Sequence, residues 1–279
     1  MKSIVVTGVS SGIGRAAAEY LTGQGFRVFG SVRRTEDGEK VRATLGEAFV
    51  PIVFDTTCET AVRTAAAKVT EALAGEPLSG LVLNAGIAVP GPLLYVKPED
   101  FRRQLEVSLT GTLLTAQAFA PRLIGPPPGR VVVITSVAGK NALPFNGPYS
   151  IAKFGTEAFA AVLRREMMPF GVDVIAIAPG PVQSAIWKKS AAVDLSPLEG
   201  TAYAAPAAKA LTMMQTAAAE ALPAERIARA IHRALTARRP RTRYVITPDF
   251  LSYCALRLLP ARLADRIIAK ALGLIPPRR

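Results

Sequence analysis

Tyr149 and Lys153 stand four residues apart in a stretch long enough to form a helix. Residues at that spacing lie one turn apart on the same helix face, so both side chains can reach one ligand. A tyrosine with its usual pKa of about 10 is a poor base, but a neighbouring ammonium group favours the phenolate. The pair therefore predicts acid/base chemistry in which Tyr149 transfers a proton and Lys153 supports it.

A glycine-rich segment follows the first apolar run, at residues 7–14. Its glycines stand where a strand would turn sharply into a helix, so a pyrophosphate can approach the backbone closely. The N-terminus of that helix offers free N–H groups and the positive end of the helix dipole to an anion. The predicted dinucleotide-binding positions are Gly8, Ser10, Ser11, Gly12, Ile13 and Gly14.

The elements that must position these groups alternate along the chain. Short β-branched runs predict strands at residues 3–7, 27–31, 50–54, 81–83, 130–135, 172–178 and 244–246. Longer patterns predict helices at residues 13–23, 59–73, 98–123, 148–168 and 224–237. This alternation is typical of βαβ units, so we expect an α/β fold with a parallel sheet and helices on both faces.

Several motifs in one order give the chain a resemblance that no single residue carries. The glycines have the spacing Gly-x-x-x-Gly-x-Gly, and after them come Asn84-Ala85-Gly86, Ser136, Tyr149-Ser150-Ile151-Ala152-Lys153 and Pro179-Gly180. In this order, over residues 3–184, the chain resembles the short-chain dehydrogenase/reductase family. The resemblance implies one Rossmann-like domain with a doubly wound parallel sheet. It also implies hydride transfer between NAD(P) and an alcohol or carbonyl compound.

The resemblance also assigns roles to individual residues. Tyr149 would exchange a proton with the substrate oxygen, Ser136 would hydrogen-bond that oxygen, and Lys153 would also hold the nicotinamide ribose. Asp55 with Thr56 would hold the adenine. The remaining implied cofactor contacts are Asn84, Ala85, Gly86, Pro179, Gly180 and Val182.

The end of the second predicted strand bears on the choice of cofactor. An acidic residue there would bind a ribose 2′-hydroxyl, whereas an arginine would accept a 2′-phosphate. The strand ends in Arg33 and Arg34 without an acid, and Arg33, with Ser11 of the glycine segment nearby, is the expected phosphate ligand. A guanidinium group pairs with phosphate through two hydrogen bonds, so NADP is favoured and NAD is the alternative. Two solvated arginines would explain the same residues.

Ser108 departs from the family pattern. The resemblance places an asparagine in the helix before the fifth strand, and here that context reads Val107-Ser108-Leu109-Thr110-Gly111. The hydroxyl is shorter than an amide but can hydrogen-bond the backbone locally. We therefore expect Ser108 to belong to the catalytic group with reduced or altered turnover. A non-catalytic dinucleotide-binding sensor is the alternative that this departure leaves open.

The substrate side carries a weaker pattern. Residues 143–149 and 167–171 are similar to the hydroxysteroid and retinol dehydrogenase branch of the family, which implies an apolar steroid-, retinoid- or lipid-like alcohol or carbonyl substrate. Residues 183–222 are rich in Ala and Met and include Trp187. They follow a strand at the edge where such folds bind ligands, so we expect a helical substrate lid. A packed cover without a substrate role would give the same pattern.

Positive charge is concentrated near the C-terminus. The formal net charge is +13, and residues 226–279 hold 13 Lys or Arg against 2 Asp or Glu. We expect a catalytic domain over residues 1–248 and a basic amphipathic extension over residues 249–279. Its mixed stretches at residues 250–259 and 263–272 favour contact with a membrane surface, the protein body or a second subunit. Aromatic and basic residues do not interleave there as in a nucleic-acid groove, so no nucleic-acid partner is expected.

Other chemistries have less support. Cys58 and Cys254 form no Cys-x-x-Cys pair, so we expect neither a disulfide framework nor a metal site and favour a cytoplasmic location. The segment at residues 8–12 matches the Gly-x-Ser-x-Gly pattern of serine hydrolases. However, His232 is the only histidine and lies in an Arg-rich helical pattern. The family resemblance further implies a homodimer or homotetramer.

Overall fold

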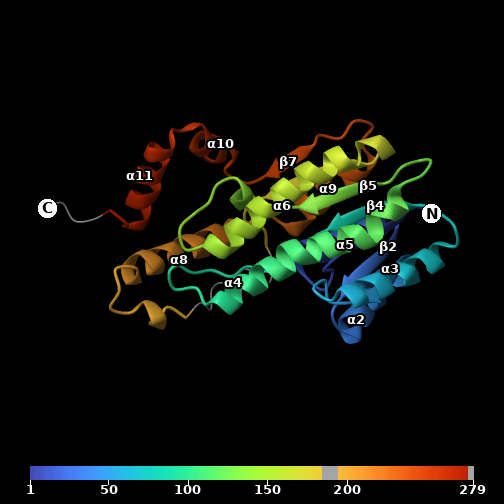
Figure 1. Ribbon diagram of the computed structural model, residues 1–279, viewed down its shortest axis with the longest axis horizontal. Helices are drawn as coiled ribbons and strands as arrows, with labels where there is room; N and C mark the ends of the chain where they lie inside the picture. The colour runs from blue at the N-terminus through green and yellow to red at the C-terminus, as the bar shows by residue number, and fades with distance from the viewer. Residues whose placement is uncertain (184–193, 276–279) are drawn as a thin grey trace.

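The computed structural model describes residues 1–183 and 194–275, and its centre is a seven-stranded parallel sheet (Figure 1). The strands are β1 (Ser3–Val6), β2 (Arg27–Val32), β3 (Phe49–Val53), β4 (Leu78–Leu83), β5 (Arg130–Ile134), β6 (Asp173–Pro179) and β7 (Arg243–Ile246). Their order is β3-β2-β1-β4-β5-β6-β7. Because the order reverses between β1 and β4, the loops after these strands separate and leave a crevice at the carboxyl edge.

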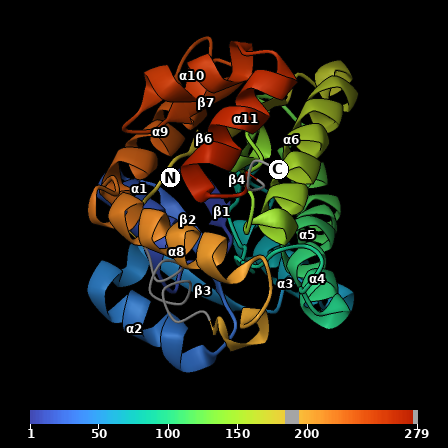
Figure 2. The ribbon, with the colours of Figure 1, turned by 90° about the vertical axis from the view of Figure 1, so that its left-hand side faces the viewer.

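Helices cover both faces of the sheet, as Figure 2 shows. One face carries α1 (Gly12–Gly23), α2 (Thr35–Leu45) and α9 (Ala224–Thr236), and the other carries α3 (Glu59–Leu73), α4 (Pro98–Leu105), α5 (Gly111–Phe119) and α6 (Gly147–Glu166). The short helical elements are η1 (Gly46–Ala48), η2 (Glu106–Thr110), η3 (Ala120–Leu123), η4 (Val137–Gly139), η5 (Met168–Phe170) and η6 (Ser196–Leu198). The expected Rossmann-like doubly wound sheet is confirmed.

Two apolar cores lie against the sheet, one on each face. Leu21 of α1 and Ile227 of α9 pack in one, and Phe54 and Phe119 stack in the other. The central strands β1, β5 and β6 are almost fully buried because they are covered on both sides, which explains their unbroken β-branched runs. The sheet therefore holds the ends of β1, β4, β5 and β6 at fixed positions.

Two helical predictions differ from the structure. The single helix expected over residues 98–123 is divided by η2, a π-helical stretch, and by the 3₁₀ turn η3. The sequence analysis did not predict α2, because only Gly38 and Val41 of this helix are buried and it lacks an apolar stripe.

A third layer covers the carboxyl edge of the sheet. It consists of η6, α8 (Ala204–Ala219), α10 (Phe250–Leu258) and α11 (Ala261–Leu272). Leu272 of α11 packs with Leu198, Ala207 and Ala210 of the expected lid and with Phe145, which lies just before α6. Part of that lid, including Trp187, lies outside the described residues.

The C-terminal extension begins after β7. Strand β7 ends at Ile246 and α10 begins at Phe250, and the domain boundary expected at residue 248 stays a prediction. Among the helices in residues 1–183 and 194–275, none is both long and apolar enough to cross a lipid bilayer.

Candidate active site

The glycine segment forms a tight turn between β1 and α1. Gly12 has a φ of +59°, in the left-handed region that favours glycine, and a Cβ on Gly14 would collide with the backbone carbonyl of Gly8. No side chain of the described residues caps the N-terminus of α1 at Ser11. The first N–H groups of this helix are thus available to an anionic ligand, and the cradle fits a pyrophosphate.

Asn84 and Thr7 fix this turn to the end of β4. Asn84 Nδ2 donates to the carbonyl oxygens of Thr7 (2.8 Å) and Gly8 (3.4 Å). Thr7 Oγ1 accepts from the backbone N–H groups of Asn84 (2.8 Å) and Ala85 (2.9 Å). Ser31 Oγ holds the loop from the other side, because it accepts from Gly8 N at 2.9 Å. The sequence analysis missed Thr7 and Ser31 as site residues, although both are hydroxyl residues at the ends of buried strands.

Tyr149, Lys153 and Ser136 come together at the ends of β5 and β6. Lys153 is 6% exposed and its Nζ donates to the carbonyl oxygen of Ile134, the last residue of β5, at 2.9 Å. The same Nζ lies 5.8 Å from the centroid of the half-buried Tyr149 ring. Ser136 is buried, and its hydroxyl accepts from Ala138 N (3.1 Å). Tyr149 and Lys153, which were predicted to share one helix face, therefore lie in the same place as Ser136, the serine that follows β5.

Burial controls the protonation of this group. Desolvation raises the pKa of the Tyr149 phenol above its usual range, and the nearby Ser136 hydroxyl partly opposes the change. Desolvation lowers the pKa of Lys153 to about 8, and the carboxylate of Glu157 on the next turn of α6 opposes that change. At neutral pH the phenol is protonated and the amine is charged, so Tyr149 is in the form that donates a proton. Glu157 was not singled out from the sequence.

Ser108 also reaches this group. It lies in the middle of η2 and is 1% exposed. A Cβ built on Gly86 would stand 3.5 Å from Ser108 Oγ and 4.0 Å from Lys153 Nζ. The hydroxyl and the ammonium group therefore lie beside the same glycine, and the catalytic role of Ser108 stays a prediction.

The two arginines after β2 differ in their surroundings. Arg33 is exposed and forms no hydrogen bond or ion pair with any residue that the structure describes. Arg34 donates through Nε (3.0 Å) and Nη2 (3.2 Å) to the carboxylate of Asp37, and this guanidinium group lowers the pKa of Asp37. Of the two, Arg33 has its donors available for a 2′-phosphate.

The other predicted cofactor contacts lie around the same crevice. Asp55 Oδ1 accepts from Thr57 N (2.9 Å) and from Thr57 Oγ1 (2.8 Å), while Thr56 is buried beside Gly111. These contacts hold the turn after β3.

The residues after β6 are held by β7 and by the start of α9. Gly180 donates to Ile246 O at 2.8 Å, and a Cβ on Gly180 would collide with Thr247. Leu222 N donates to Pro181 O and Gln183 N donates to Leu222 O, both at 2.9 Å. In this parallel bridge the N–H and C=O of Val182 point away from Leu222. A ligand on that side could therefore accept a hydrogen bond from the Val182 N–H and donate one to the Val182 C=O.

The hydrolase alternative receives no support from the position of His232. Its ring packs edge-on against Tyr20 (5.7 Å between centroids) and Phe26 (5.9 Å), between α9 and the C-terminal part of α1. Ser10 lies in the loop at the opposite end of α1, and no hydrogen bond joins it to His232 among the described residues. His232 is a packing residue here.

Comparison with known proteins agrees with this geometry. A family model described as short chain dehydrogenase matches residues 2–194. The chain belongs to this family. It is an oxidoreductase of the NAD(P)-binding type and falls with the retinol dehydrogenase-like and hydroxysteroid dehydrogenase-like members.

Two relatives cover most of the chain. An NADPH-dependent 3-dehydrocapnine reductase from Ornithobacterium rhinotracheale is 37% identical over 98% of each chain. Retinol dehydrogenase 16 from Mus musculus is 32% identical over 96% of this chain and 87% of its own. The crystal structure of a short-chain dehydrogenase from Streptomyces avermitilis shares the fold, with a TM-score of 0.78, 24% identity and 96% of each chain covered.

Proposed function

We propose that this protein reduces a ketone or aldehyde on an apolar, lipid-like molecule with NADPH, and that Tyr149 donates the proton. The observation that carries the proposal is the group formed by the half-buried Tyr149 with the buried Lys153 and Ser136, near the glycine cradle. The relatives named as an NADPH-dependent reductase and a retinol dehydrogenase support the reductive direction and the apolar substrate. The reverse oxidation of an alcohol uses the same residues.

The protonation states fit carbonyl reduction. Because its pKa is raised, the Tyr149 phenol keeps its proton at neutral pH and can transfer it to the carbonyl oxygen as negative charge develops there. The Ser136 hydroxyl would donate a hydrogen bond to the same oxygen. The charged Lys153 then stabilises the phenolate that remains on Tyr149.

The cofactor would be held by residues from four loops. The N–H groups at the start of α1 would face the pyrophosphate, Arg33 would face the 2′-phosphate, Asp55 and Thr56 would hold the adenine, and Lys153 of α6 would hold the nicotinamide ribose. The N–H and C=O of Val182, which point away from Leu222, match a carboxamide, which both donates and accepts. Bound in this way, NADPH supplies the hydride.

A direct test combines binding and turnover. Fluorescence titration should show tighter binding of NADPH than of NADH, and NADPH consumption should then be followed with a panel of apolar ketones and aldehydes. Turnover that disappears in Tyr149→Phe supports the proposal. Retention of full turnover by that variant, or tighter binding of NADH, would overturn the proton donor or the cofactor respectively.

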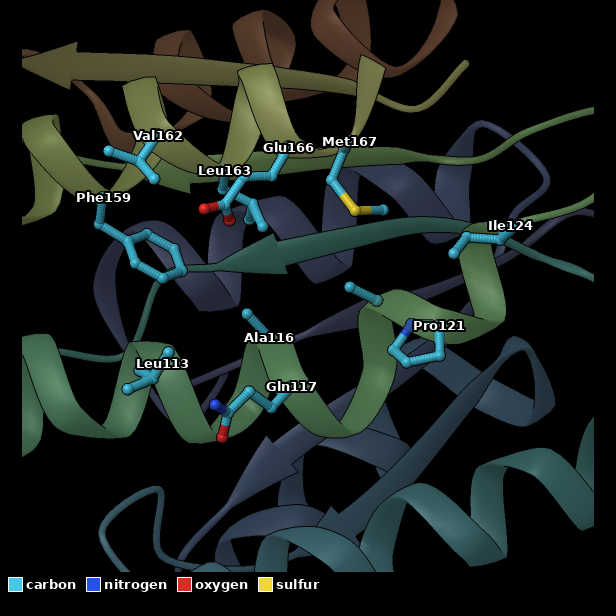
Figure 3. A pocket seen from close by; sticks show the side chains of 11 residues that line it. Leu113, Ala116, Gln117, Pro121, Ile124, Phe159, Val162, Leu163, Glu166 and Met167 are labelled. Atoms are coloured by element: carbon cyan, nitrogen blue, oxygen red, sulfur yellow. The ribbon is translucent and has the colours of Figure 1, made fainter. Parts of the chain in front are cut away.

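We also propose that the chain forms a homodimer through α5 and α6. Figure 3 shows Leu113, Ala116 and Gln117 of α5 facing Phe159, Val162 and Leu163 of α6 across a groove of about 380 Å³. Leu113 and Val162 are exposed apolar residues, and a second copy of the same helix pair would cover them. Leu113→Lys/Val162→Lys should lower the mass measured by light scattering to that of one chain, whereas an unchanged mass contradicts this interface.

The basic C-terminal extension stays our candidate for contact with a membrane surface. Leu251 and Leu258 of α10 are 81% and 85% exposed, and Arg257 and Arg262 belong to the same extension. Co-sedimentation with anionic but not zwitterionic vesicles, lost in Leu251→Ser/Leu258→Ser, is the expected result. Equal recovery in the supernatant with both vesicle types would exclude it.

A further inference from the structure

Gln104 is a buried amide that the reaction as described above does not use. It is 0% exposed and lies in the last turn of α4, four residues before Ser108. Its Oε1 accepts from Val89 N at 2.8 Å, and its Nε2 donates to Ile87 O at 3.0 Å and to Ser108 Oγ at 2.9 Å. Both ends of this amide are therefore committed, and its orientation is fixed by three partners.

These hydrogen bonds join two parts of the chain that meet at Lys153. Residues 87–89 follow the end of β4, whereas Ser108 belongs to the π-helical stretch η2. Ser108 Oγ also accepts from Ile87 N at 3.4 Å, and its own carbonyl oxygen accepts from Thr112 Oγ1 at 3.0 Å. The Ser108 hydroxyl oxygen already accepts from Gln104 Nε2 and Ile87 N, so the Ser108 hydroxyl proton points toward neither of these groups. Gly86 separates it from Lys153 Nζ.

We propose that Gln104 and Ser108 act as one positioning unit, in which Gln104 supplies the amide that the short side chain of Ser108 lacks. Gln104 holds residues 87–89 against η2 and fixes the Ser108 hydroxyl beside Gly86, so that Lys153 keeps a closed and dry surrounding. Ser108 is therefore one half of a two-residue device and not a defect in the site. This inference rests on the proposed function and extends it.

A double-mutant cycle tests the pair, with variants Gln104→Leu, Ser108→Asn and Gln104→Leu/Ser108→Asn. We expect Gln104→Leu to lower kcat for carbonyl reduction by about tenfold, since it leaves buried partners unpaired and loosens residues 86–89. Ser108→Asn alone overfills the space beside Gln104 and also lowers kcat. The double variant restores an amide to this site at position 108, where it can pair with groups that Gln104→Leu leaves unpaired, so it should recover much of the loss.

The pH profile separates positioning from simple destabilisation. Opening residues 86–89 to water relieves the desolvation of Lys153, so the pKa that now stands at about 8 should rise in Gln104→Leu. Thr115→Val is the matched control, because Thr115 is equally buried on α5 and donates only to Gly111 O within its own helix (2.7 Å). It should lower the melting temperature without moving the pH profile.

The outcomes of this cycle are distinct from those that test the proposed function. If Gln104→Leu changes only the melting temperature, as Thr115→Val does, or if the single effects simply add in the double variant, the positioning unit is refuted. If the unaltered chain has no Tyr149-dependent turnover, the proposed function fails. In that case the pKa of Lys153 is measured from the pH dependence of NADPH binding instead of turnover. If this pH dependence is the same in Gln104→Leu and in the unaltered chain, the positioning unit is refuted.

Discussion

The floor of the active site and its cover are built in different ways. The floor consists of residues 84–89, η2, Ser136 and the first turns of α6, and the cover consists of η6, α8, α10 and α11. In the floor, buried polar groups are tied to strand ends by hydrogen bonds such as Lys153 Nζ to Ile134 O. The cover packs through a small apolar cluster around Leu272 and Phe145 and leaves large side chains such as Leu258 exposed. The catalytic residues are thus held by the sheet, and under the proposed function the less tightly packed cover would determine which substrates fit.

One network connects the two regions. Glu157, on the turn of α6 after Lys153, forms a buried ion pair with Arg243 of β7 at 3.0 Å. Arg243 also donates to the hydroxyl of Tyr253 on α10 (3.0 Å), and Asn141 Nδ2 after η4 donates to Tyr253 O (3.3 Å). The cover therefore touches the floor close to Lys153, and its removal would be felt there.

The largest effect is expected from the floor. Tyr149→Phe should lower kcat for carbonyl reduction by about 10³-fold, because the ring keeps its packing but has no proton to transfer. Steady-state kinetics with NADPH and fluorescence titration check this, and NADPH binding should persist. Tyr203→Phe, in the cover, is the matched control: its ring packs edge-on against Phe145 and Tyr95, and kcat should not change. An equal loss of kcat in Tyr149→Phe and Tyr203→Phe would contradict the distinction between floor and cover.

The next effect concerns the cofactor alone. Arg33→Ala should weaken NADPH binding by about 10- to 100-fold, the value of a charged hydrogen-bonded contact, and leave NADH binding unchanged. Arg34→Ala removes a guanidinium group that Asp37 already holds, so its effect on NADPH should be smaller. Isothermal titration of both cofactors decides between them. A larger loss in Arg34→Ala would show that the pairing with Asp37 breaks when the phosphate binds.

A smaller effect is expected from the cover. Leu272→Ala removes a buried side chain and should cost about 2 kcal/mol of stability, while raising KM for apolar carbonyl substrates more than it lowers kcat. Leu258→Ala, at an 85% exposed position, should change neither. Thermal unfolding and kinetics on one apolar substrate measure both effects. A fall in kcat with constant KM would instead show that Leu272 helps to position the catalytic residues of the floor.

The smallest effect is a shift along the pH axis. Reduction should slow as pH rises through about 8, because Lys153 then loses the charge that stabilises the phenolate. Glu157 opposes the lowering of this pKa, so Glu157→Gln should move the falling limb to lower pH. The exposed Glu166→Gln on the same helix is the control. A limb that moves upward, or does not move, contradicts the influence of Glu157, and a melting curve reports the loss of its pair with Arg243.

The sequence alone predicted the sheet and the proximity of Tyr149 and Lys153 because both depend on local patterns. β-branched runs give the strands, and the four-residue spacing of Tyr149 and Lys153 survives in any straight helix. The sequence favoured Arg33 over Arg34 for the 2′-phosphate, and the fold adds a reason that the sequence could not give, namely that Asp37 already pairs with Arg34.

Gln104 and Glu157 were missed for a different reason. Each is a single polar residue within a helical pattern, where a solvated position is the ordinary expectation. Their partners, Val89 and Arg243, are distant in the sequence, and no local pattern records such contacts. The break at η2 was likewise hidden, because the apolar pattern continues through it.

The bridge between Val182 and Leu222 has a consequence for how such proteins diversify. It joins the two ends of residues 183–222 by backbone hydrogen bonds, beside β6 and just before α9. Because the entropy of closing a loop rises only slowly with its length, a segment fastened at its base can be lengthened, shortened or exchanged with little cost to the rest of the fold. We therefore expect insertions and deletions between Val182 and Leu222 to change the substrate range of such proteins. The catalytic residues can stay unchanged while this happens.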